Sequence, residues 1–205
     1  MNLKQWIAII LALLSVSLHI SDGWSETSSG LNPGDMAPSI EASKWLRGGP
    51  VDEFESGQVY VVDLWSTWCK PCIASMPTLH ELETKYAGKV TVIAMTVWEF
   101  APQGVPKFME SLGDTMPTIV ALDSIPEGKE VNEGLTAVKY LGTSDSASIP
   151  KSFLIDESGR VAWIGTPENL EEPLSHVLAG TWDLKSFSES YSRQQAASEN
   201  GTAAD

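Results

Sequence analysis

The chain has 205 residues, of which 42% are hydrophobic and eight are tryptophan, enough apolar material for the core of one ordinary domain. Its formal net charge of −14 repels nucleic-acid phosphates and acidic lipids, and its 13 Lys and Arg residues are scattered along the sequence. We therefore expect a single domain with a well-solvated surface and no nucleic-acid partner.

Residues 1–25 have the layout of a secretory signal peptide. Lys4 precedes an apolar run over residues 6–20, and small residues follow it. The run is short for a membrane span, which needs about 20 apolar residues. We expect cleavage near Gly23 or Ser25, with an uncleaved signal anchor as the alternative. Both predict a periplasmic or otherwise exported protein.

The main domain is expected over residues 26–182, and its first half alternates between strands and helices. The segment before the first long strand is rich in Gly, Ser and Pro, and we expect it to form loops around one short extended segment. Residues 58–65 are rich in β-branched and aromatic side chains and predict a buried strand. Residues 71–87 place apolar side chains at helical spacing, and residues 89–98 predict a second buried strand.

The second half continues this alternation and ends in a hairpin. Two strands flanking the turn Glu-Ser-Gly predict an antiparallel pair. The expected segments are a helix over 105–113, a strand over 118–123, a helix over 131–142, strands over 150–156 and 160–165, and a helix over 168–180. This order predicts an α/β fold with a mixed central sheet covered by helices on both faces.

Residues 183–205 form a polar segment with few large apolar side chains. Such a composition gives little apolar surface to bury, so it favours disorder. We expect a frayed helix that leads into a disordered tail.

The two cysteines, Cys69 and Cys72, are separated by only two residues. A structural disulfide here would close a tiny loop and remove little entropy from the unfolded chain. Zinc needs further Cys or His ligands, and outside the leader only His80 and His176 are available. Covalent haem attachment needs a histidine where Ile73 stands. A peroxidatic cysteine would want an arginine nearby, and none adjoins the pair in sequence.

Dithiol exchange is the chemistry whose requirements the local sequence meets. Cys69 falls at the start of the predicted helix, where free backbone N–H groups and the helix dipole stabilise a thiolate. Lys70 adds a positive charge, or is simply a solvated lysine, and Pro71 fixes the first helical turn. Cys72 lies one turn further on, where it can attack a mixed disulfide formed at Cys69.

The stretch DLWSTWCKPC, with Pro77 on the same helix and SIPKSFLIDESGRVAWIG downstream, resembles the thioredoxin superfamily. The exported context resembles its TlpA-like bacterial thiol:disulfide oxidoreductases, and the likeness covers roughly Gly34 to Thr181. It implies that Trp68 flanks the nucleophile as an apolar platform. It also implies that Pro150 is a cis-proline and that the backbone of Ile149 meets an extended substrate, with a helix kink at Pro77.

Asp63 interrupts the apolar strand before the cysteines, where an ionised side chain is costly to bury. The resemblance implies that an aspartate here lies beneath the pair and helps to deprotonate the second thiol. Many TlpA-like proteins instead carry an uncharged amide here and a glutamate three residues after the second cysteine, where this chain has Ser75. The alternative for Asp63 is a hydrogen-bonded strand residue without a catalytic task.

These observations predict an exported thiol:disulfide oxidoreductase that uses Cys69 and Cys72, with no metal or organic cofactor. A buried acid that helps the second thiol favours a reductase acting on exported protein dithiols or disulfides, supplied with electrons by a membrane donor. A copper-binding assembly protein that uses His80 is the alternative, and a peptide-binding chaperone is a third possibility. The long insert between Trp98 and Ser148 is expected to shape specificity.

Overall fold

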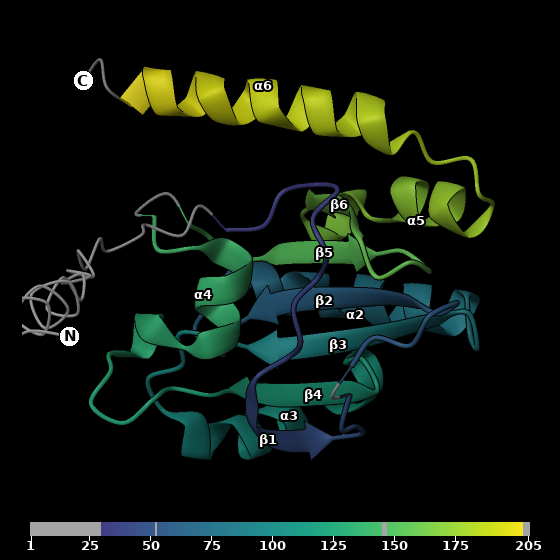
Figure 1. Ribbon diagram of the computed structural model, residues 1–205. Helices are drawn as coiled ribbons and strands as arrows, with labels where there is room; N and C mark the ends of the chain where they lie inside the picture. Colours follow the sequence, from purple (N-terminus) through teal and green to yellow (C-terminus); the bar gives the residue numbers. More distant parts are fainter. Residues whose placement is uncertain (1–29, 52, 145–146, 203–205) are drawn as a thin grey trace, which may run out of the picture.

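A six-stranded sheet in the order β1-β4-β3-β2-β5-β6 lies at the centre of the molecule (Figure 1). The computed structural model describes residues 30–51, 53–144 and 147–202, so the expected leader lies outside the described residues. The strands are β1 (Ala42–Arg47), β2 (Val59–Trp65), β3 (Val90–Thr96), β4 (Ile119–Asp123), β5 (Lys151–Ile155) and β6 (Val161–Gly165).

The strand directions confirm the expected mixed sheet. Strands β2, β3 and β4 are parallel neighbours, whereas the pairs β1–β4, β2–β5 and β5–β6 are antiparallel. The β5–β6 pair is the hairpin predicted from the sequence. Every residue of β2 is buried, as expected for a central strand with covered faces.

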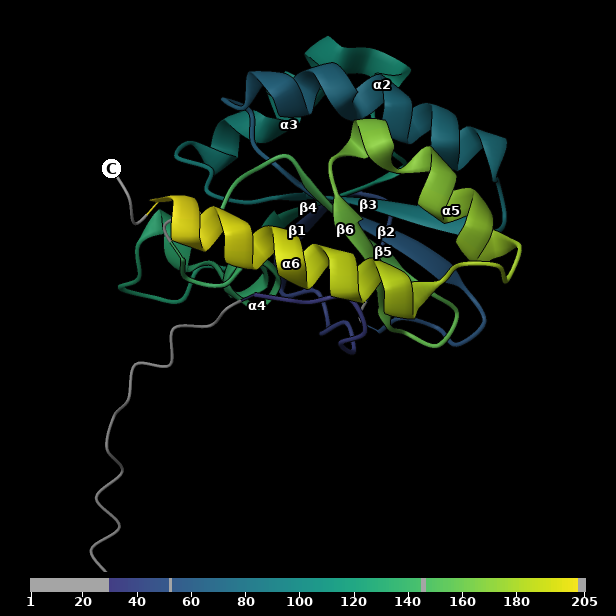
Figure 2. The ribbon, with the colours of Figure 1, turned by 90° about the horizontal axis from the view of Figure 1, so that it is seen from above.

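Helices cover both faces of the sheet (Figure 2). Because side chains alternate along a strand, Val61 and Trp65 of β2 pack in one core layer while Val62 and Leu64 pack in the other. Helices α2 (Lys70–Lys85), α3 (Val105–Leu112) and α5 (Glu171–Leu178) belong to the first layer, and α4 (Leu135–Leu141) to the second. Short 3-10 turns lie at η1 (Pro102–Gly104), η2 (Gly113–Thr115), η3 (Val131–Glu133) and η4 (Pro167–Asn169).

The helix expected over 131–142 is divided in the structure. Gly134 has an extended backbone, with φ −60° and ψ 140°, which separates η3 from α4. Helix α4 is capped by a carboxylate from β4, because Asp123 accepts hydrogen bonds from the backbone N–H of Thr136 at 2.8 Å and of Ala137 at 3.0 Å. The cap comes from a distant strand, so the local pattern could not place the start of the helix.

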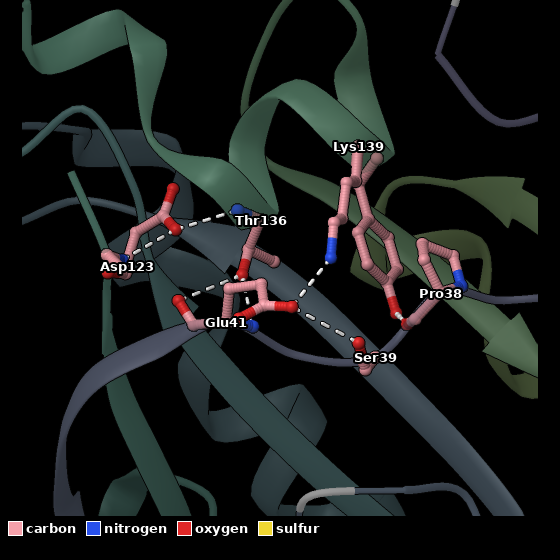
Figure 3. A network of polar contacts seen from close by, with 8 residues as sticks. Pro38, Ser39, Glu41, Asp123, Thr136 and Lys139 are labelled. Carbon is pink, nitrogen blue, oxygen red and sulfur yellow. Dashed lines mark hydrogen bonds and ion pairs between the residues drawn. The ribbon is translucent and has the colours of Figure 1, made fainter. Parts of the chain in front are cut away.

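A polar network joins the segment before β1 to helix α4 (Figure 3). The backbone N–H of Glu41 donates to Thr136 Oγ1 at 2.9 Å, and Lys139 Nζ lies 2.7 Å from Glu41 Oε1. Tyr140 donates its hydroxyl to the carbonyl of Pro38 at 2.8 Å. The approach segment is therefore held against the domain rather than running free.

Residues 184–202 form one continuous helix, α6 (Leu184–Thr202), where a frayed helix leading into a disordered tail was expected. Asp183 caps its start by accepting a hydrogen bond from the N–H of Ser186 at 3.0 Å. Phe187 and Tyr191, one turn apart, pack against the two core layers, and Phe187 also stacks on Trp182 with ring centroids 5.3 Å apart. Two aromatic anchors thus dock a helix whose composition is otherwise polar, beside the edge strand β6 (Figure 1).

Candidate active site

The cysteines lie where β2 passes into α2, as expected, and they form a disulfide with a Cα–Cα distance of 5.3 Å. Cys69 is the N-cap of α2, and its Sγ accepts a hydrogen bond from the N–H of Cys72 at 3.3 Å. This is the helix start that stabilises negative charge on sulfur. Cys69 keeps 4% of its surface exposed and Cys72 none, so a partner from solvent reaches Cys69 first.

The residues around the pair lie at the same end of the sheet. Lys70 and Pro71 are exposed in the first turn of α2, and Pro77 lies inside the helix. Leu64, near the end of β2, pairs with Lys151 at the start of β5, which brings the preceding Ile149–Pro150 segment to this end. The Ile149–Pro150 peptide bond is cis, as expected. The contact of Ile149 and Pro150 with substrate stays a prediction.

Asp63 is completely buried, as its position in an apolar strand predicts. Its alternation with Val61 and Trp65 turns it toward the core layer that contains Cys72. Ser152 Oγ donates to Asp63 Oδ1 at 2.6 Å, while Oδ2 has no hydrogen-bond partner among the described residues. Burial raises the pKa of Asp63 to about 7; the Ser152 hydrogen bond opposes the rise and the negative charge of Glu168 adds to it.

Ser75 occupies the position on α2 where the resemblance would have allowed a second acid. Its side chain is buried, and Oγ donates to the carbonyl of Cys72 at 2.9 Å. The first turn of α2 contains no acidic residue. The acid nearest in sequence on this side of the sheet is therefore Asp63 on β2, which faces the core layer that α2 covers.

Glu99 is a structural part of the site that the sequence analysis did not single out. Its Oε2 accepts hydrogen bonds from Thr67 N at 2.9 Å and Thr67 Oγ1 at 2.8 Å, and its Oε1 accepts one from Ala101 N at 3.3 Å. Trp68 Nε1 also donates to the carbonyl of Trp98 at 2.9 Å. In the sequence Glu99 directly follows the strand predicted over residues 89–98, but no local pattern connects it to the cysteine turn.

The two histidines in the described part of the chain, His80 and His176, form no metal-binding cluster with the cysteines. His176 is exposed, with Nδ1 2.9 Å from Thr181 Oγ1, while His80 Nδ1 is buried on α2 without a hydrogen-bond partner among the described residues. Within residues 30–51, 53–144 and 147–202, no three His, Cys, Asp or Glu side chains cluster in a way that could hold a metal ion. In the same ranges, no helix combines the length and apolar character that crossing a membrane requires.

Comparisons with known proteins agree with this geometry. The Redoxin family matches residues 32–179. Protein FixW of Rhizobium leguminosarum is 30% identical over 159 residues, covering 76% of this chain and 70% of FixW. Thiol-disulfide oxidoreductase ResA of Bacillus thuringiensis (strain Al Hakam) is 30% identical over 174 residues, covering 83% of this chain and 91% of ResA.

Solved structures show the same fold. A thiol-disulfide isomerase from Corynebacterium glutamicum superposes with a TM-score of 0.58 at 21% identity, covering 71% of this chain and 95% of that one. A structure described as a thiol:disulfide interchange protein DsbE from Chlorobium tepidum gives a TM-score of 0.51 at 26% identity, covering 72% and 99%. The chain belongs to the redoxin family and is a TlpA-like thiol:disulfide oxidoreductase of the thioredoxin superfamily.

Proposed function

We propose that the protein reduces disulfides of exported proteins, with Cys69 as the attacking thiol and Cys72 as the resolving one. In the first step the Cys69 thiolate attacks one sulfur of the substrate disulfide, forms a mixed disulfide and expels one substrate thiolate. In the second step the Cys72 thiolate attacks Cys69 Sγ, closes the Cys69–Cys72 disulfide and expels the substrate's other thiolate. Two electrons pass from the pair to the substrate.

The position of Asp63 is the observation that carries this proposal. A carboxylate with a pKa of about 7 can accept the proton of Cys72 near neutral pH and release it later. Its Oδ2, which no described residue donates to, is an acceptor on the side of the sheet where Cys72 lies. Help of this kind speeds release of the reduced substrate, which suits a reductase.

The reductase direction requires a source of electrons outside the protein. An exporting leader over residues 1–25 would deliver the chain to an oxidising compartment, where a reduced dithiol does not persist without resupply. We propose a membrane thiol donor for this task. N-terminal sequencing of the mature protein should give a start near Trp24 or Glu26; a start at Met1 in the membrane fraction would establish an uncleaved anchor instead.

A redox titration against glutathione and a substrate-reduction assay test the proposal together. We expect a reduction potential near the thioredoxin value of about −270 mV and catalysed reduction of a protein disulfide such as insulin. A potential near about −120 mV would make the protein an oxidant. Stoichiometric tight copper binding by the reduced protein without any reductase activity would favour the copper-handling alternative.

A further inference from the structure

Two exposed aromatic rings form a surface beside the disulfide. Trp68, directly before Cys69, is 47% exposed, and Phe100, in the loop after β3, is 75% exposed. Their ring centroids lie 6.2 Å apart with the planes tilted by 44°. Adjoining exposed apolar side chains at one place commonly mark a binding surface.

The loop that carries Phe100 is fixed to the cysteine turn by several hydrogen bonds. Glu99 joins Thr67 to Ala101 through three donors, and the Trp68 indole is bonded to the Trp98 carbonyl. Two further bonds link the preceding residues: Val97 N donates to Trp65 O at 2.8 Å, and Ser66 Oγ donates to Val97 O. The Trp68 ring and the backbone that carries Phe100 are therefore fixed relative to each other before any partner binds.

The backbone of Trp98 supports the same conclusion. Its φ of +53° is in the left-handed region, which is unfavourable for a residue with a side chain. Such a conformation persists when the surrounding contacts over-determine it, and it is common at functional sites. Here the left-handed residue Trp98 lies directly before the buried Glu99 and the exposed Phe100.

We propose that Trp68 and Phe100 together bind a large apolar side chain, aromatic or long aliphatic, that stands beside the reacting cysteine of an extended polypeptide. This deepens the proposed function and rests on it. The surface is continuous with the reacting sulfur, since Trp68 and Cys69 are adjacent in the chain. An aromatic pair on a fixed backbone loses little entropy when a partner binds, so it can discriminate between side chains.

Glu99 is then a positioning residue of this surface. It lies beneath the loop and contacts Thr67 and Ala101 rather than the exposed face. Weakening its bonds should loosen the two rings relative to each other and reduce selectivity among substrates.

Two cyclic peptides test the proposal, each closed by one disulfide and identical except for Phe or Ser beside one cysteine. Reduced protein is mixed with each peptide, the reaction is quenched with acid, and the opened peptide is quantified. Each rate is divided by the rate at which dithiothreitol opens the same peptide. We expect the Phe peptide to open about fivefold faster than the Ser peptide, and Phe100→Ala to reduce this ratio to below about twofold.

The matched control is Met36→Ala, which also removes an exposed large apolar side chain. Met36 bridges to Arg160 beside the β5–β6 turn, at the end of the sheet away from Lys151 and the cis peptide. This variant should keep the wild-type ratio. An equal ratio in wild type and Phe100→Ala overturns the inference and leaves the proposed function standing. Failure to open either peptide overturns both.

Thr67 variants test the positioning role of Glu99. Thr67→Val removes the hydroxyl that donates to Glu99 and should lower the peptide ratio about twofold, whereas Thr67→Ser keeps the donor and should restore it. The ratio compares two peptides on one protein, so a uniform loss of folded protein does not change it. An unchanged ratio in Thr67→Val and in Glu99→Gln would refute a positioning role.

Discussion

Replacing Asp63 with Asn in the oxidised protein isolates the cost of burying one carboxylate, because the thiols are then absent as titrating groups. The pKa of Asp63 is about 7 in the folded protein and about 3.9 in an unfolded chain. At a pH between these two pKa values, Asp63 is protonated in the folded state and ionised in the unfolded state. The stability that this group contributes is therefore fully present below about pH 4 and is lost as pH rises toward 7.

The size of the loss follows from the difference between the two pKa values. About three units correspond to about 4 kcal/mol of unfolding free energy, an upper limit if water reaches the group. Asn can keep the hydrogen bond from Ser152, but its NH2 would occupy the place of Oδ2, which has no partner among the described residues. An unmet buried group costs about 1–3 kcal/mol. We expect Asp63→Asn to be about 2 kcal/mol less stable than wild type at pH 4 and about 2 kcal/mol more stable at pH 8.

Denaturant titrations of both oxidised proteins between pH 4 and pH 8 measure this difference. Groups shared by the two proteins cancel, so the stability difference should change sign between pH 4 and 7, as the wild-type curve falls below that of the variant, and stay constant above. Ser152→Ala removes the hydrogen bond that lowers the Asp63 pKa and should move the decline to higher pH, whereas Glu168→Gln should move it to lower pH. Parallel curves for wild type and Asp63→Asn would mean that Asp63 does not titrate in this range and would refute the reasoning.

The remaining predictions concern the exchange steps and two structural contacts. Cys72→Ser should accumulate mixed disulfides with substrate proteins in non-reducing gels, and Cys69→Ser should not; the reverse pattern would exchange their roles. Phe187→Ala should lower the unfolding free energy by about 2 kcal/mol, because this half-buried ring anchors α6, and protease should then release the helix. Asp123→Ala should cost about 2 kcal/mol in denaturant by removing the cap of α4, and a change below about 0.5 kcal/mol would show that the cap is dispensable.

The sheet and the position of the cysteines could be predicted because their signals are local. The β-branched residues of β2 and the turn between β5 and β6 are recognisable from the residues of those segments alone. The place of Cys69 at a helix start follows from the change from strand to helix pattern around it. A frayed helix was expected at the start of this segment, but the full length of α6 was not predicted, because its stability depends on two aromatic side chains that dock on distant elements. The spacing of Phe187 and Tyr191 by four residues, after the cap residue Asp183, was the available signal.

The parts of the site that lie in or next to the cysteine motif could be predicted from the sequence. Asp63 could be recognised because a charge in an apolar strand is conspicuous. Glu99 and Phe100 could not, since their roles depend on the left-handed turn at Trp98 and on contacts with Thr67 and Trp68 about thirty residues earlier. The long insert was expected to shape specificity, and its first residues are those that reach the cysteine turn.

Four acids are buried among the described residues, and their hydrogen bonds separate structural roles from a chemical one. Glu83 accepts bonds from Thr118 on both oxygens, and Glu99 and Asp123 likewise have donors to both of theirs. Asp63 alone in this set leaves one oxygen unmet. A buried carboxyl with so few donors is a poor structural element, because an apolar residue of similar size would stabilise the strand more. This arrangement supports the proposed role of Asp63 in proton transfer to and from Cys72.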